Sequence, residues 1–269
     1  MKKTGEIMLI LFSREKIIIN KTNNFITLVG DPLNPPTITG NDSVNSGTID
    51  NTYSTATFTV NADYFIAINI KFENTAPHTP GKDSQAVAFR ASGNKTAFYN
   101  CSFYGGQDTL YDHKGFHYFN NCFIQGSVDF ICGYGRSLYE NCRVNSIANN
   151  VSSITAQKRA MKSLLSGFSF KNCKITGTGK VYFGRAWGDY SRVVFSYTYM
   201  DSLILPEGWS PWNKPTINMC IGPGANRSGR VPWARLLTDE EASPFTGTYF
   251  VDGDSWLTNP MIQGDNCFT

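Results

Sequence analysis

The sequence predicts an all-β protein, a parallel β-helix formed by one chain, with long loops on one side and a short C-terminal helical tail. First, a motif of the form aromatic-x-Asn-Cys-x-apolar occurs four times. Second, apolar and polar residues mix at short period around each copy, as in 96–103, which is typical of strands. Third, repeats of roughly 20 to 30 residues indicate a solenoid, and neither the regular leucines of leucine-rich repeats nor the helices of tetratricopeptides are visible.

The repeat fixes which residues are expected to stack. Its asparagines are Asn100, Asn121, Asn141 and Asn172, and Asn74 is interpreted as an earlier copy. We expect these asparagines and the cysteines beside them to form ladders inside the coils. The asparagine amides would satisfy one another, and each cysteine would act as a small buried hydrophobe.

The remaining elements follow from local patterns. The first residues imitate a signal peptide, but Glu6 interrupts a short apolar run and no small-residue cleavage site follows, so a strand is predicted instead. Loops are expected where Pro, Gly, Asn and Ser cluster, and Thr238 to Glu241 forms a capping box. In chain order we expect a strand at 7–12, a coil at 25–30, a loop at 31–49, strands from about residue 57, a loop with His78 at 76–84, an excursion at 146–165, and a short helix from about 239 in a tail that folds back on the coils.

Composition limits the function classes. A chain of 269 residues with 17% charged and 14% aromatic residues suits one elongated folded domain. The net charge of +3 permits a polyanionic partner without requiring one, and no nucleic acid or membrane partner is indicated. Seven cysteines, four of them in the repeat, favour thiols over a disulfide framework, and no Cys/His metal spacing occurs. Sequons suit a secreted glycoprotein; they begin at Asn20, Asn41, Asn94, Asn100, Asn150 and Asn226.

Two aspartates are the strongest candidates for a catalytic site. Asp108 lies in the segment 105–111 and Asp129 in the segment 126–131, each eight residues after a repeat asparagine. One coil therefore separates them, and the stacking of parallel strands would bring them roughly 4.8 Å apart. Two carboxylates at that distance cannot both ionise freely, so one is expected to serve as an acid and the other as a nucleophile.

Other polar and aromatic residues are expected to surround this pair. Gln85 and Gln107 can donate amide hydrogens to a developing oxyanion, and Arg185 can hold one carboxylate ionised through a bidentate bond. His113 and His117 are interpreted as solvated or packing residues. Any one of these residues alone is more often structural, but five polar groups around one point favour a catalytic role. Flat aromatic faces suit sugar rings, and the candidates for this contact are Phe130, Trp187, Trp209 and Trp212.

These motifs resemble the plant pectin methylesterases, also called pectinesterases, over nearly the whole chain. The resemblance is carried by the segments 85–90, 105–111, 126–131, 154–157, 184–187 and 222–226. It implies a right-handed β-helix and a substrate of methylesterified homogalacturonan. It also implies no metal or organic cofactor, secretion to the cell wall, a monomer, and a proteinaceous inhibitor as a further partner.

The resemblance further implies the role of each residue. Asp129 would be the nucleophile on the methyl-ester carbonyl, and Asp108 the general acid and then the general base. Gln85 and Gln107 would form the oxyanion site. Arg185 would orient Asp129, and Trp187 would line the sugar groove.

Three departures from the family pattern are visible. The beginning looks truncated, so residues 1–269 are interpreted as a single pectinesterase catalytic domain that lacks part of its N-terminus. Tyr134 is bulky near the nucleophile and is expected to crowd the groove. A coil between Trp212 and Gly222 looks shortened, which would unpair a row of backbone groups or shift a register.

Two alternatives stay open. One is a catalytically impaired homologue that binds pectin or a proteinaceous inhibitor. The other is a different β-helix enzyme, a polysaccharide lyase or a polygalacturonase. Lyases of this fold need a calcium site with a basic catalyst, and galacturonases need clustered aspartates. Neither cluster is evident in the sequence.

Overall fold

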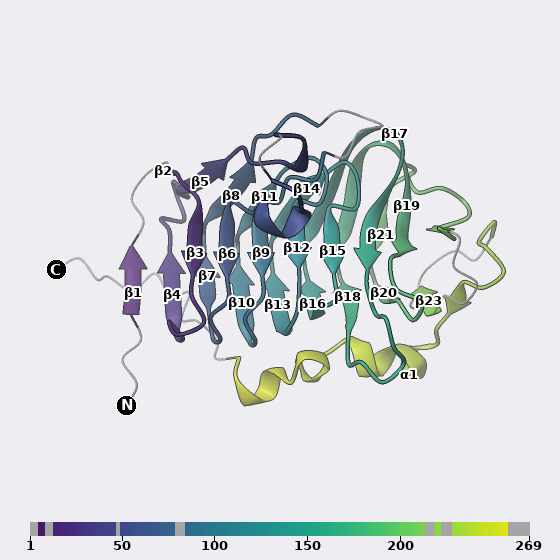
Figure 1. The fold of residues 1–269 in the computed structure, drawn as a ribbon. Coiled ribbons are helices and arrows are strands. Elements are labelled where there is room, and N and C mark those ends of the chain that lie inside the picture. Colours follow the sequence, from purple (N-terminus) through teal and green to yellow (C-terminus); the bar gives the residue numbers. More distant parts are fainter. Residues whose placement is uncertain are drawn as a thin grey trace.

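The computed structural model describes residues 5–8, 13–46, 49–78, 84–212, 218–221 and 228–257. Over these ranges the chain winds into a right-handed parallel β-helix (Figure 1). The regular coils add one strand to each of three stacked faces, and neighbouring strands pair in parallel. The fold class that the repeat predicts is therefore confirmed.

The three faces are built as follows. The first face stacks β1 (Gly5–Met8), β4 (Ile26–Val29), β7 (Ile66–Ile68), β10 (Thr96–Tyr99), β13 (Phe116–Asn120), β16 (Arg136–Glu140), β18 (Gly167–Lys171), β20 (Arg192–Ser196), β23 (Asn218–Ile221) and β24 (Arg235–Leu236). The second stacks β2 (Ser13–Arg14), β5 (Thr37–Gly40), β8 (Lys71–Asn74), β11 (Ser102–Tyr104) and β14 (Phe123–Gly126). The third stacks β3 (Ile17–Ile19), β6 (Phe58–Val60), β9 (Phe89–Ala91), β12 (Leu110–Asp112) and β15 (Ile131–Gly133).

Two long strands join the second and third faces. β17 (Arg143–Gln157) pairs with β14 at its beginning and with β15 at its end, and β19 (Lys174–Ala186) follows it. β21 (Tyr199–Met200) and β22 (Trp209–Ser210) then pair with the two ends of β19. The expected excursion at 146–165 is therefore largely a strand, which continues to Gln157 with a register shift between Ile147 and Val151.

The interior of the helix is a stack of aromatic rings in phase with the repeat. Phe98, Phe119, Tyr139, Phe170 and Phe195 lie on successive coils with ring centroids 4.5 to 4.6 Å apart and nearly parallel planes. Such offset-stacked pairs stabilise the core beyond the burial of their area. The thiols of the repeat are buried beside them, which confirms the cysteine ladder; they are Cys101, Cys122, Cys142 and Cys173.

The asparagine ladder, by contrast, is wrong. The four repeat asparagines are exposed, and their φ angles lie between 52° and 57°, at the corner between the first and second faces. Asparagine is among the few residues that adopt this left-handed conformation readily, so backbone geometry explains the repeat. Asn74 is also out of phase: it lies buried in β8, and Asn69, with φ 56°, occupies the corner of that coil.

The local elements differ in part from those predicted from the sequence. The segment 31–49 is not wholly a loop, because it contains β5 and a 3₁₀ helix, Val44–Ser46. At the start, Gly5–Met8 confirms part of the predicted strand, while residues 9–12 lie outside the described ranges. In the shortened late coil, β23 pairs in register with β20 and β24, so the expected loss of pairing is not found for these four residues. Residues 213–217 and 222–227 lie outside the described ranges.

The C-terminal tail packs along the first face, as Figure 1 shows in yellow. The helix α1 (Asp239–Ala242) begins with the predicted capping box, in which Thr238 and Glu241 bond to each other's backbone N–H groups. Phe250 then packs against the outer side chains of the first face. The tail also contains three 3₁₀ helices, Ser243–Phe245, Thr248–Val251 and Gly253–Ser255. Another 3₁₀ helix, Thr52–Ser54, lies earlier in the chain. Helices in the described ranges all fall short of the length and apolarity that a membrane span requires.

Candidate active site

The two candidate aspartates occupy equivalent positions in consecutive coils, each two residues before a strand of the third face. The backbone N–H of Asp108 donates to the Val128 carbonyl at 3.0 Å, and that of Asp129 donates to the Ser153 carbonyl at 2.7 Å. Both aspartates have left-handed backbone conformations, with φ 60° and 47°. A left-handed residue costs free energy in a regular strand, and such residues gather at functional sites. The predicted phase of the pair is thus present.

A glycine allows the second aspartate to turn out of its strand. A Cβ on Gly126 would come 2.2 Å from the Cβ of Phe130 and 2.7 Å from the hydroxyl oxygen of Thr109. Any other residue there would displace the corner that carries Asp129. This explains why a glycine marks the segment that the sequence singled out.

Asp129 and Arg185 form the central ion pair. Asp129 is 4% exposed. Arg185 reaches it from β19, and its Nε lies 2.9 Å from both carboxylate oxygens, while Nη2 lies 2.5 Å from Oδ2. The Trp212 ring covers the guanidinium, with 4.0 Å between its centroid and Cζ. Charge-assisted, forked bonds of this kind fix both the orientation and the charge of a carboxylate.

The surroundings of the two carboxyls differ. Burial raises the pKa of Asp108 well above its ordinary value, and repulsion from Asp129 adds to that rise. Burial also raises the pKa of Asp129, but the hydrogen bonds and the charge of Arg185 oppose that rise. A single negative charge on the pair is therefore favoured on Asp129, with the proton on Asp108.

The two glutamines lie in the same stack. Gln107 forms parallel bridges with Gln85 on one side and with Val128 on the other. Its Oε1 accepts the backbone N–H of Ser84 at 3.3 Å, and no hydrogen bond within the described ranges uses its amide N–H groups. Among the described residues, the Oε1 of Gln85 is buried without a hydrogen-bond partner. Such unsatisfied groups are uncommon in folded proteins and are frequent at binding sites.

Of the four aromatic candidates, two lie at the surface and two do not. Trp187 is half-buried beside Tyr111, with ring centroids 6.4 Å apart, and Trp212 is 39% exposed. Phe130 and Trp209 are both 0% exposed. The sequence prediction that these two stack on sugar rings is therefore wrong, because both fill the interior of the β-helix.

Sequence reasoning missed several neighbours of the pair. Tyr111, Cys132 and Ala156 form the outward row of the third face that leads to Arg185, because they align in register on β12, β15, β17 and β19. Tyr111 belongs to the same segment, 105–111, as Asp108. The alternation of side chains along this strand could therefore have predicted that Tyr111 points outward. A cavity of about 220 Å³ beside Arg185 is lined by Val128, Ser153 and Tyr182 among others.

His113 and His117 make their hydrogen bonds away from the aspartate pair. His117 is fully buried, its Nδ1 is 2.5 Å from the Asp112 carboxylate and its Nε2 is 2.9 Å from the Gly93 carbonyl. It is a packing residue and not a solvated one. His113 is held between Ser92 and Tyr134 by hydrogen bonds of 2.8 and 2.7 Å. Tyr134, expected to crowd the groove, thus has its hydroxyl directed to His113.

Comparisons with known proteins agree on one family. The family model described as Pectinesterase matches residues 10–254. Putative pectinesterase 14 of Arabidopsis thaliana is 45% identical over 256 residues, which cover 91% of this chain and 76% of that protein. Pectinesterase QRT1 of the same plant is 42% identical over 259 residues, which cover 91% and 68%. The solved structure of pectin methylesterase from carrot has a TM-score of 0.88 at 31% identity, over 96% of this chain and 86% of that one.

Proposed function

The chain belongs to the pectinesterase family and is a carboxylic ester hydrolase, and we propose that it hydrolyses methyl esters of homogalacturonan through an aspartyl nucleophile. One observation carries the mechanistic part. Asp129 is buried, and its carboxylate accepts hydrogen bonds from two nitrogens of Arg185. Asp108 lies in the preceding coil, and its pKa is raised. This arrangement supplies a charged nucleophile and a protonated acid at the same point.

The first half of the proposed reaction releases methanol. The Asp129 carboxylate attacks the ester carbonyl carbon, and the electron pair of the C=O bond moves to oxygen. Amide N–H groups of Gln85 and Gln107 stabilise this oxyanion. As the C–O bond to the methoxy group breaks, Asp108 gives its proton to the leaving oxygen. Methanol departs, and the galacturonyl group stays bound to Asp129 as an anhydride.

The second half restores the enzyme. Asp108, now a carboxylate, takes a proton from a water molecule, whose oxygen attacks the galacturonyl carbon of the anhydride. The bond to Asp129 breaks, and its electron pair returns to the Asp129 carboxylate beside Arg185. The released galacturonic acid loses its proton to solvent. Asp108 is again protonated, and both carboxyls have regained their initial states.

The aromatic surface supports a sugar polymer as the substrate. Trp187 follows Arg185 by two residues, Trp212 lies against the guanidinium of Arg185, and both tryptophans are accessible. In this proposal their rings stack on the apolar faces of galacturonate residues next to the scissile ester. Trp212 also covers Arg185, so it limits the access of water to the ion pair.

Methanol release from methylated pectin tests the activity. We expect turnover by the intact chain, and a loss of at least about 10³-fold in kcat for Asp129→Asn and Asp108→Asn. Gln107→Ala should lower kcat by about 10²- to 10³-fold. Asp50→Asn, on an exposed loop, is the matched control and should retain full activity. A folded sample that releases no methanol would refute the proposal.

Secretion to the cell wall and a monomeric, single catalytic domain over residues 1–269 are further parts of this proposal. Exposed sequon asparagines at Asn20, Asn41 and Asn150 support secretion, because N-glycans are added to accessible sites on secreted chains. Glycosidase treatment of protein recovered from plant cell walls should lower its mass. An unchanged mass would count against glycosylation, and size-exclusion chromatography would test the monomer.

A further inference from the structure

The strand β17 forms a bulge where it passes from the second face to the third. Its pairing with β19 shifts register between Ile147 and Val151, so three residues of β17 lie opposite the single residue Gly179 of β19. A Cβ on Gly179 would come 2.6 Å from the carbonyl oxygen of Ala148, and the φ of this glycine, 81°, is left-handed. Bulges re-aim side chains and are over-represented next to active sites.

Hydrogen bonds fix the base of the bulge at Ala148. Its N–H donates to the Ser146 hydroxyl at 3.2 Å, and its carbonyl accepts the Thr178 hydroxyl at 3.0 Å. The Ser146 hydroxyl in turn donates to the Thr178 carbonyl at 2.9 Å. Ala148 is 3% exposed, whereas the next three residues, 149–151, are exposed. The bulge therefore presents these three residues to solvent from a fixed base.

The exposed end of the bulge adjoins the cavity beside Arg185. Residues 151–153 line that cavity together with Arg185. The Ser152 hydroxyl donates to the Ser127 carbonyl at 2.5 Å, which ties this part of β17 to the preceding coil. The Cα of Asn150 lies within roughly 7 Å of that of Ser152, because an extended chain spans at most about 3.6 Å per residue. Asn150 thus stands at the second-face rim of the catalytic cavity.

The sequence makes Asn150 an acceptor for an N-linked glycan. Asn150-Val151-Ser152 is a sequon of the form Asn-x-Ser. Asn150 is exposed and Val151 is 63% exposed, so the folded bulge leaves room for a bulky substituent. The neighbouring Asn149 is exposed as well, but it is not an acceptor, because Val151 stands two residues after it.

We propose that Asn150 carries an N-glycan that covers the second-face side of the catalytic cavity and limits the access of long polymer chains to Asp129. The donor is a lipid-linked oligosaccharide diphosphate of the secretory pathway. The amide nitrogen of Asn150 bonds to the anomeric carbon of the first sugar, and the bond from that carbon to the diphosphate oxygen breaks. The electron pair leaves with the diphosphate, and the amide nitrogen loses one proton to a base.

The glycan acts by its bulk and leaves the reacting groups unchanged. Asp129 keeps its ion pair with Arg185, so the rate of the chemical steps stays the same. A long chain has to enter from the third-face side, where Trp187 follows Arg185, while a short oligomer passes the glycan. The glycan therefore raises KM for long chains without altering kcat.

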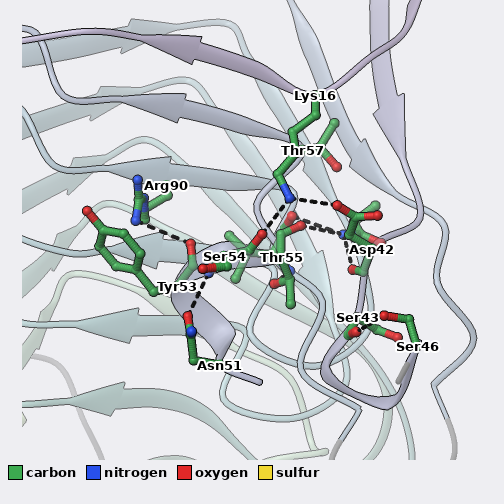
Figure 2. Close-up of polar contacts among 12 residues, drawn as sticks. Lys16, Asp42, Ser43, Ser46, Asn51, Tyr53, Ser54, Thr55, Thr57 and Arg90 are labelled. Carbon is green, nitrogen blue, oxygen red and sulfur yellow. Dashed lines mark hydrogen bonds and ion pairs between the residues drawn. The ribbon is translucent and has the colours of Figure 1, made fainter. Parts of the chain in front are cut away.

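The sequon at Asn41 supplies a control at a distance from this cavity. Asn41 is exposed and follows β5, which is four strand spacings from β17 on the second face, or roughly 19 Å. Figure 2 shows the residues that come after it: the Asp42 carboxylate pairs with Lys16 at 2.6 Å, and the Ser43 carbonyl accepts the Ser46 hydroxyl at 2.6 Å. A glycan on Asn41 therefore stands over the first coils and leaves the entrance to the catalytic cavity open.

Mass spectrometry of the protein secreted by plant cells tests the modification without turnover. Trypsin cleaves after Arg143 and Lys158, and the peptide 144–158 contains the Asn150 sequon alone. We expect this peptide to carry a glycan, and glycosidase release in heavy-oxygen water should leave a labelled aspartate at position 150. An unmodified Asn150 would overturn the proposal, whatever the occupancy of the other sequons.

Kinetics test the effect of the glycan, and only this step rests on the proposed function. Asn150→Gln should lower KM for long methylated chains about three- to tenfold with kcat unchanged, because removing a barrier speeds association. Kinetics on methylated trigalacturonate should not change. Glycosidase treatment of the folded protein should lower KM in the same way. Asn149→Gln alters the same bulge but keeps the acceptor, so it should behave like the unmodified chain, as should Asn41→Gln.

Production in a host that adds no N-glycans separates the glycan from the asparagine side chain. There the unmodified chain and Asn150→Gln should share the same low KM. An equal KM for long chains with and without the glycan, in samples that release methanol, would overturn the effect on access and leave the function standing. An occupied Asn150 in a folded protein that releases no methanol would refute the proposed function and leave the modification site standing.

Discussion

The ion pair between Arg185 and Asp129 makes the proposed mechanism testable by replacing the arginine alone. Arg185→Gln removes three close N–O contacts from a carboxylate that is 4% exposed. Breaking a buried ion pair by removing one partner typically costs about 3 to 5 kcal/mol, because a charge is left buried without compensation. The variant can avoid this cost by protonating Asp129, and a protonated carboxyl cannot serve as the proposed nucleophile.

The direction of the pH effect follows from that linkage. Arg185 lowers the pKa of Asp129 against the effect of burial, so its removal raises that pKa further. About 3 kcal/mol corresponds to roughly 2 pKa units. We expect the acidic limb of kcat, measured by methanol release, to move to higher pH by about 2 units. A carboxyl whose pKa is higher in the folded chain than in the unfolded chain destabilises the fold as the pH rises through the pKa that it has in the unfolded chain.

Thermal denaturation supplies the second readout. Arg185→Gln should melt close to the unmodified chain near pH 3 and about 6 to 12 °C below it at pH 7. Arg185→Gln/Asp129→Asn contains no buried charge at this point, so it should recover much of the stability at pH 7 without recovering activity. The reasoning would be refuted by an acidic limb that does not move, or by a loss of stability that is equal at both pH values and is not rescued.

Three further predictions concern the scaffold. The pKa of His113 is lowered from 6.5 to about 4, so the unfolded chain binds more protons than the folded chain between these pH values. The free energy of unfolding should therefore fall on acidification through that window. In urea denaturation, His113→Gln should show a flatter dependence of this free energy on pH. Asn121→Ala should destabilise the fold by about 1 kcal/mol at its φ of 53°, whereas Asn121→Gly should be nearly neutral; equal losses would refute the backbone explanation. Tyr139→Phe removes a 2.6 Å hydrogen bond to the buried Asp112 carboxylate and should cost about 1.5 to 3 kcal/mol in the same assay, and a loss under about 0.5 kcal/mol would refute it.

The sequence predicted the parts of the fold that repeat. The period of the Asn-Cys motif gave the coil, and the coil gave the phase of Asp108 and Asp129, because stacking depends only on spacing. The same period did not reveal what the asparagines do. The sequence shows where these asparagines lie in the repeat. It does not show their left-handed φ, because an asparagine in an internal ladder and one at an exposed corner leave the same pattern in the sequence. Asn74 was misplaced because Asn69 lacks the cysteine that marks the other copies.

The four aromatic candidates show where sequence reasoning stopped. Side chains alternate along a strand, so an outward Arg185 places Trp187, two residues on, outward as well. Trp209 belongs to a later strand, and its direction depends on its register with β19. It pairs with Gly184, which belongs to the row of residues that point into the β-helix, and its ring packs on Phe183 at a centroid distance of 5.2 Å. That register is set by a connection of irregular length that carries no repeat, and a shift of one residue would have exposed the indole. Only three-dimensional pairing could therefore decide which tryptophans face outward.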